Sequence, residues 1–168
     1  MELNILIRIP LLLIPFILII RYRNSLIGWI SKIKLPRILL ALIVSIPLII
    51  FEEHINCGAY GCTNVFLPPT LWFLLVMELG FFLLLKIIPI KNIIFQTVFL
   101  STLGIIFELF IGAAHAEFQQ LAFSQPATFF LLSLWVAVSY AFVLFLPLLI
   151  LKVQPIFNSR SSTSTSSV

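Results

Sequence analysis

The segment IIFQTVFLSTLGIIFELFIGAA, residues 93–114, decides the fold class of this chain. It carries a single charge, Glu108, in a run long enough to cross a bilayer, which takes about 20 apolar residues in a helix. The whole chain of 168 residues has the same character, with 61% hydrophobic and 10% charged residues and a mean hydropathy of +1.20. Soluble domains are roughly a quarter charged. The sequence therefore predicts an all-α integral membrane protein.

Four other apolar runs accompany this segment, at residues 3–20, 38–51, 70–85 and 128–151. Together the five runs predict a bundle of five transmembrane helices that fills one domain, residues 1–157. The first run contains two prolines, Pro10 and Pro15, which are expected to kink its helix. Residues 158–168 are mostly Ser and Thr, and they predict a disordered cytoplasmic tail.

Charge is sorted along the chain. Nine of the ten Lys and Arg residues lie in or beside three gaps between apolar runs, whereas the six acidic residues, all Glu, lie elsewhere. Neither residues 52–69 nor residues 115–127, the two loops on the other side, contain a Lys or Arg. Because Lys and Arg are retained on the cytoplasmic side, the pattern predicts an external N-terminus, a cytoplasmic C-terminus and a place in the cell membrane.

The basic segment 21–37 has its apolar residues at helical spacing, at Leu26, Ile30 and Ile33. This pattern predicts a short basic helix that lies in the inner interface of the bilayer. The formal charge of +4 is therefore assigned to topology and to attraction for anionic lipid headgroups. No basic patch is interleaved with aromatics in a polar segment, so nucleic acid is not an expected partner.

A polar stripe runs along the fourth predicted helix. Its members, three or four residues apart, are Thr97, Ser101, Gly104, Glu108, Gly112, His115 and Gln119. Residues at this spacing share one helix face, and a polar face inside a membrane must meet protein or water. Tyr140, midway along the fifth predicted helix, is expected to reach this stripe with its hydroxyl. The stripe is either an acid–base site that uses Glu108 and His115 or a seam where small residues let helices approach.

Two further ionisable residues fall inside predicted spans. Glu78 lies near the middle of the third, and an intramembrane carboxyl group is by default a candidate functional residue. Arg8 is the one cation away from the inner side, so it is the candidate ion-pair partner of Glu78 or Glu108. Either the pair is structural and fixes the first helix, or the two Glu residues form a proton or cation relay.

The outer end of the second predicted helix carries further polar residues. Ala41, Ser45, Glu52 and Asn56 share one of its faces, and Glu53 and His54 follow Glu52. Imidazole and carboxylate groups suit Zn²⁺ or non-haem iron. A metal site would draw its ligands from His54, His115, Glu53 and Glu117. The alternatives are a haem b held between the two His residues, or hydrated side chains without a cofactor.

Cys57 and Cys62 enclose four residues of the first outer loop. Because the outer side is often oxidising, they are expected to form a disulfide.

Three classes of function remain open. The first is an accessory or structural subunit that assembles with other membrane subunits. The second is an intramembrane enzyme that acts on a lipid or isoprenoid through Glu108, Glu78 and His115. The third is a proton or cation transport module built on the same residues.

Overall fold

The computed structural model of this chain describes residues 2–57, 70–88, 90–111 and 116–152. These ranges are almost entirely helical and contain no strand. The elements in chain order are α1 (Glu2–Ile30), α2 (Arg37–Cys57), α3 (Leu71–Ile87), α4 (Ile93–Ile106), the π-helical turn η1 (Phe107–Ile111), α5 (Ala116–Ser124) and α6 (Pro126–Lys152). The predicted all-α class is therefore confirmed for this part of the chain.

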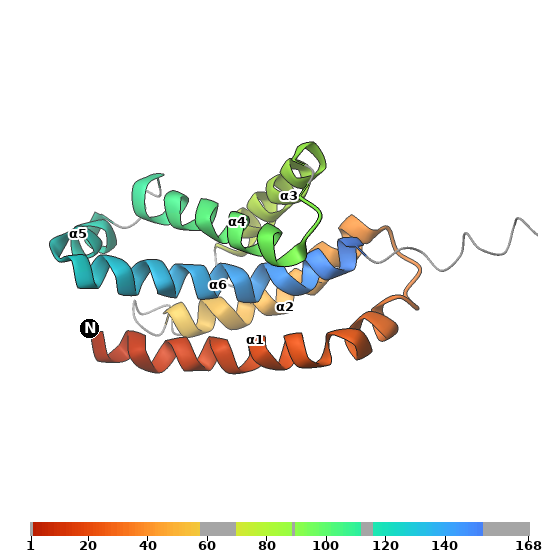
Figure 1. Cartoon of the computed structure of the whole chain (residues 1–168), viewed down its shortest axis with the longest axis horizontal. Helices are drawn as coiled ribbons and strands as arrows, with labels where there is room; N and C mark the ends of the chain where they lie inside the picture. Colours follow the sequence, from red (N-terminus) through yellow and green to blue (C-terminus); the bar gives the residue numbers. More distant parts are fainter. Residues whose placement is uncertain (1, 58–69, 89, 112–115, 153–168) are drawn as a thin grey trace, which may run out of the picture.

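Helix α6 is the centre of the bundle. It packs against α1, α2, α4 and α5, and Figure 1 shows it running between α1 and α4 with α2 alongside. Nearly every position of α6 is apolar, and a helix that is hydrophobic on all sides is suited to being surrounded. Its buried apolar side chains are Leu132, Trp135, Val136, Phe142, Leu144, Phe145, Leu146, Leu148 and Ile150.

Four helices in the described residues are long and apolar enough to cross a membrane. They cover Ile7–Ile30, Arg37–Asn56, Ile93–Ile111 and Pro126–Lys152. Helix α3 corresponds to the remaining predicted span, but it has 17 residues. At 1.5 Å per residue it is about 25 Å long, which is less than the hydrocarbon thickness of about 30 Å. It packs mainly on α2, and Figure 1 shows it inclined to α4 and α6.

Helix α1 differs from its prediction in its length. It contains Pro10 and Pro15 within one helix, and it also includes residues 21–30, so the basic segment does not form a separate helix. No helix-breaking residue separates Ile20 from Arg21, and a backbone in an apolar surrounding has no alternative hydrogen-bond partners. The helix ends at Ile30, and a turn that begins at Ser31 leads to Pro36. The second predicted outer loop likewise contains a helix, α5, which packs on α6.

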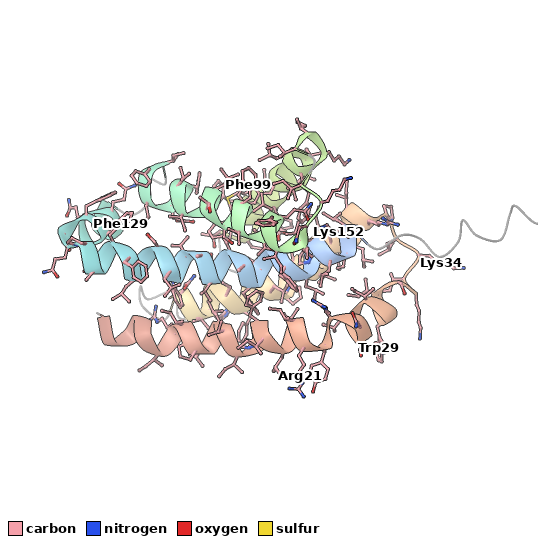
Figure 2. All side chains as sticks on the ribbon, in the orientation of Figure 1. Arg21, Trp29, Lys34, Phe99, Phe129 and Lys152 are labelled. Atoms are coloured by element: carbon pink, nitrogen blue, oxygen red, sulfur yellow. The ribbon has the colours of Figure 1, made fainter. Side chains whose placement is uncertain are left out.

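Cations close one end of the bundle. The Arg37 Nη1 atom donates a hydrogen bond to the Leu151 carbonyl oxygen at 3.4 Å, and the Lys152 ammonium group donates one to the Lys91 carbonyl oxygen. The Asn92 side chain caps α4 by accepting from the Ile94 amide at 2.8 Å. Figure 2 shows Lys152 toward the same end as the α1–α2 connection, with Phe129 toward the other. Arg37 thus binds a carbonyl group at the C-terminal end of α6, and Lys152 binds one just before α4.

Candidate functional site: an acidic cluster at α2, η1 and α6

Glu52 contributes the buried carboxyl group of the cluster. It lies on the face of α2 that also buries Ala41 and Ser45, which confirms that these residues share one face. Glu52 is 7% exposed, and the Asn56 side-chain amide, one turn further on, donates a hydrogen bond to its Oε1 atom. The Ser139 hydroxyl of α6 lies beside the same carboxyl group without a hydrogen bond of standard geometry. Helix α2 therefore places the carboxyl group of Glu52 on the side that packs against α6.

Glu108 brings a second carboxyl group from η1. It is half-buried, and its Oε1 atom accepts a hydrogen bond from the Tyr140 hydroxyl at 3.0 Å. The expected contact between Tyr140 and the polar stripe is therefore confirmed. A π-helical turn is rare, and it often occurs at functional sites because it redirects the side chains that follow it. Here it holds Glu108 at the junction of α4 and α6.

Gly104 makes this contact possible. A Cβ atom at this position would lie 2.7 Å from three ring carbons of Tyr140, so the ring rests directly on the backbone of α4. Thr97 and Ser101, on the same face, are buried as well. The stripe from Thr97 to Gly104 thus packs against protein, in the close approach that small residues permit. The Tyr140 hydroxyl also lies 3.7 Å from the Met77 sulfur, so α3 meets the cluster through this side chain.

The cluster gathers several acidic groups within electrostatic range of one another. Glu52 interacts electrostatically with both Glu53 and Glu108, and the Tyr140 hydroxyl lies within electrostatic range of all three carboxyl groups. Carboxylates close together in a medium of low dielectric constant repel one another strongly when all are ionised. A bound proton or cation relieves that repulsion. The arrangement therefore suits the uptake and release of positive charge.

Arg8 joins α1 to this region. Its Nη1 atom donates a hydrogen bond of 3.1 Å to the backbone carbonyl oxygen of Asn56, near the end of α2. The sequence suggested Glu78 or Glu108 as the partner, whereas this hydrogen bond goes to a carbonyl group. The guanidinium group thus holds α1 beside the helix end that carries Glu52.

Glu78 lies apart from these contacts. It is 2% exposed in α3, and neither of its carboxyl oxygens has a hydrogen-bond partner among the described residues. The neighbouring polar group is the Ser45 hydroxyl of α2. The structure therefore joins Glu108 and Tyr140 by a hydrogen bond and places Glu52 within electrostatic range of both, whereas Glu78 has Ser45 as its polar neighbour.

The residues predicted to bind a metal are only partly described. Glu53 is half-buried and His54 is exposed, with the His54 Nδ1 atom donating a hydrogen bond to the Ile50 carbonyl oxygen at 2.7 Å. His115 and the side chain of Glu117 lie outside the described residues, which leaves the metal and haem predictions untested. Within the described ranges, no group of three or more His, Cys, Asp or Glu side chains is arranged to hold a metal ion.

The predicted disulfide also falls outside the description. Cys57 ends α2, but its side chain is not described, and Cys62 lies in the range 58–69. Two features of the site could not be predicted from the sequence. Ser139 carries no signal beyond its place in an apolar helix, and the π-helical turn has no sequence signature. The position of Asn56 beside Glu52 could be predicted, because Asn56 follows Glu52 by four residues on one helix face.

Comparisons with protein-family models, with curated proteins and with solved structures find no match for this chain.

Proposed function

We propose that this chain is a small multi-pass membrane protein that binds and transfers protons at the cluster of Glu52, Glu108 and Tyr140. The observation that carries the proposal is the hydrogen bond from the Tyr140 hydroxyl of α6 to the Glu108 carboxyl group of η1, with the buried Glu52 carboxyl group of α2 within electrostatic range. Ionisable groups inside a membrane-spanning bundle are costly, and they mark ion pathways and proton relays. Hydroxyl groups next to the acids, from Ser139 and Tyr140, supply further positions between which a proton can move.

The test is proton flux in liposomes. Purified protein is reconstituted with an internal pH-sensitive dye, and a pH gradient is imposed. Wild-type protein is expected to collapse the gradient faster than empty liposomes, and Glu52→Gln and Glu108→Gln are each expected to abolish the difference. Thr102→Val is the control, because Thr102 is exposed and its hydroxyl bonds only to its own helix, at the Val98 carbonyl oxygen. Wild-type flux equal to that of empty liposomes would refute the proposal.

In this proposal the protein crosses the cell membrane five times, with α3 as the third span. Its N-terminus lies outside the cell. Cations at one end of the bundle and carboxyl groups toward the other support this orientation, because Lys and Arg stay on the cytoplasmic side. The lipid bilayer is then a partner along the apolar outer faces. In this orientation the acidic cluster lies toward the outer face of the membrane.

A second candidate is an accessory subunit that assembles with other membrane subunits. Helix α3 favours it, because it is shorter than the hydrocarbon core is thick and a short span is accommodated in part by association. Its outward side chains Trp72, Phe73 and Val76 are exposed in the isolated chain. Native mass spectrometry after extraction in mild detergent distinguishes the two candidates. Unlike chains bound at fixed stoichiometry, together with absent proton flux, would favour the subunit.

A further inference from the structure

Glu78 is a buried carboxyl group inside the bundle. The residue lies in the middle of α3, 2% exposed, and neither carboxyl oxygen has a hydrogen-bond partner among the described residues. Its polar neighbour is the Ser45 hydroxyl of α2. An isolated ionised carboxylate in an apolar medium costs far more free energy than its neutral acid form. Burial therefore favours a proton on Glu78.

The hydrogen bonding of Ser45 points the same way. Ser45 is completely buried, and its hydroxyl donates to the Ala41 carbonyl oxygen at 2.9 Å. A serine hydroxyl has one hydrogen to donate and two lone pairs. With that hydrogen committed to Ala41, the oxygen has only lone pairs to offer a neighbouring group such as Glu78. A carboxylate would be repelled by these lone pairs, whereas a carboxylic acid would donate its proton to them.

We propose that Glu78 is a proton-binding site inside the bundle, separate from the acidic cluster, in which the neutral acid donates a hydrogen bond to the Ser45 hydroxyl. Once the Glu78 carboxyl group rotates into hydrogen-bond geometry, the chain of donors runs from Glu78 to Ser45 to the Ala41 carbonyl, and the second Glu78 oxygen keeps no donor among the described residues. Rotating the Ser45 hydroxyl toward a carboxylate would break its bond to Ala41 and still leave the charge buried. This site does not depend on proton transfer at Glu52 and Glu108.

Proton binding at this site is coupled to helix packing. Glu78 belongs to α3 and Ser45 to α2, and α2 is the main partner of α3. Ionisation of the acid is favoured where water or a cation reaches it, and separation of α3 from α2 would provide such access. Glu78 thus stabilises the packed arrangement while it is neutral.

Infrared difference spectroscopy in lipid nanodiscs at neutral pH tests the proposal. The wild-type spectrum minus that of Glu78→Gln is expected to contain the carbonyl band of a protonated carboxyl group. Glu53→Gln is the control, because the wild-type band should persist in that variant. The proposal is overturned if Glu78→Gln instead removes a carboxylate band and leaves the protonated-acid region unchanged.

Ser45→Ala provides the second arm, and it remains informative if Glu78→Gln does not fold. Loss of the acceptor is expected to shift the acid band of Glu78 to higher frequency without removing it. A band at the wild-type frequency in Ser45→Ala would show that the acid does not donate to this hydroxyl, and it would overturn the assignment. Neither readout involves flux across a membrane, so failure here is distinguishable from failure of the proposed function.

Discussion

The backbone of Gly104 in α4 supports the ring of Tyr140 in α6, where an added Cβ atom would lie 2.7 Å from three ring carbons. One turn beyond Gly104, the Tyr140 hydroxyl donates to Glu108 at 3.0 Å. The missing side chain at position 104 therefore sets both the distance between two helices and the placement of a hydroxyl at a carboxyl group.

Substituting Gly104 with Ala is expected to lower stability. Overpacking costs about 1–3 kcal/mol, and the better helix propensity of Ala offsets about 1 kcal/mol of it, so the net loss is up to about 2 kcal/mol. Thermal unfolding in detergent measures the change. Gly80→Ala is the matched control, because no atom lies within 4 Å of its added Cβ, and it should be neutral or stabilising. Equal behaviour of the two variants would contradict the close fit at Tyr140.

Tyr140→Phe keeps the ring on Gly104 and removes the hydroxyl. The loss of its hydrogen bond to Glu108 is expected to cost about 0.5–1.5 kcal/mol in the free energy of unfolding. Reversible unfolding in mixed micelles measures it. Tyr22→Phe is the control, since Tyr22 is exposed on α1. A destabilised Tyr22→Phe beside an unaffected Tyr140→Phe would count against the contact.

Arg8→Met retains the aliphatic stem and removes the donor to the Asn56 carbonyl oxygen. A hydrogen bond from a charged group is worth about 1.5–3 kcal/mol, so α1 should loosen at the end that contains Arg8. The bundle should survive, because α1 also packs on α6. Hydrogen–deuterium exchange is expected to rise in peptides near Arg8, and the exposed Arg23→Met should leave it unchanged. Unaltered exchange in Arg8→Met would speak against this link.

Topology is tested by labelling single cysteines in intact cells with a membrane-impermeant maleimide. In a background of Cys57→Ser and Cys62→Ser, Gln120→Cys in α5 is expected to react from outside, and Lys34→Cys to react only after the membrane is permeabilised. Both positions are exposed, so access to the reagent is set by the side of the membrane. The opposite pattern would reverse the proposed orientation.

Much of the fold could be predicted from hydropathy and charge. Helices α2, α4 and α6 follow from apolar runs that have no competing structure in a membrane. The extent of α1 could not be predicted, because basic residues after Ile20 suggested a change of environment while nothing in their backbone preferences ended the helix. The helix α5 was missed because its polar residues resembled a loop.

The site was predictable along each helix but not between helices. Spacing alone placed Ser45 and Glu52 on one face of α2 and Gly104 and Glu108 on one face of α4. The partner of Arg8 depended on how α1 and α2 are offset along their axes, which is decided by side-chain packing. The contact between Tyr140 and Glu108 could be predicted from the sequence, because a tyrosine hydroxyl in the middle of a span needs a polar partner.

The central position of α6 has a consequence for biosynthesis. Because α6 follows α1 to α5 in chain order and is the shared neighbour of four of them, the earlier helices emerge from the ribosome before the surface on which they assemble. Until α6 is inserted, Ser139 and Tyr140 are absent, so Glu52 and Glu108 must be sheltered by the insertion machinery or remain near the headgroups. A nascent chain arrested before residue 126 should accordingly be a substrate for membrane quality-control proteases, whereas one released after Lys152 should escape them.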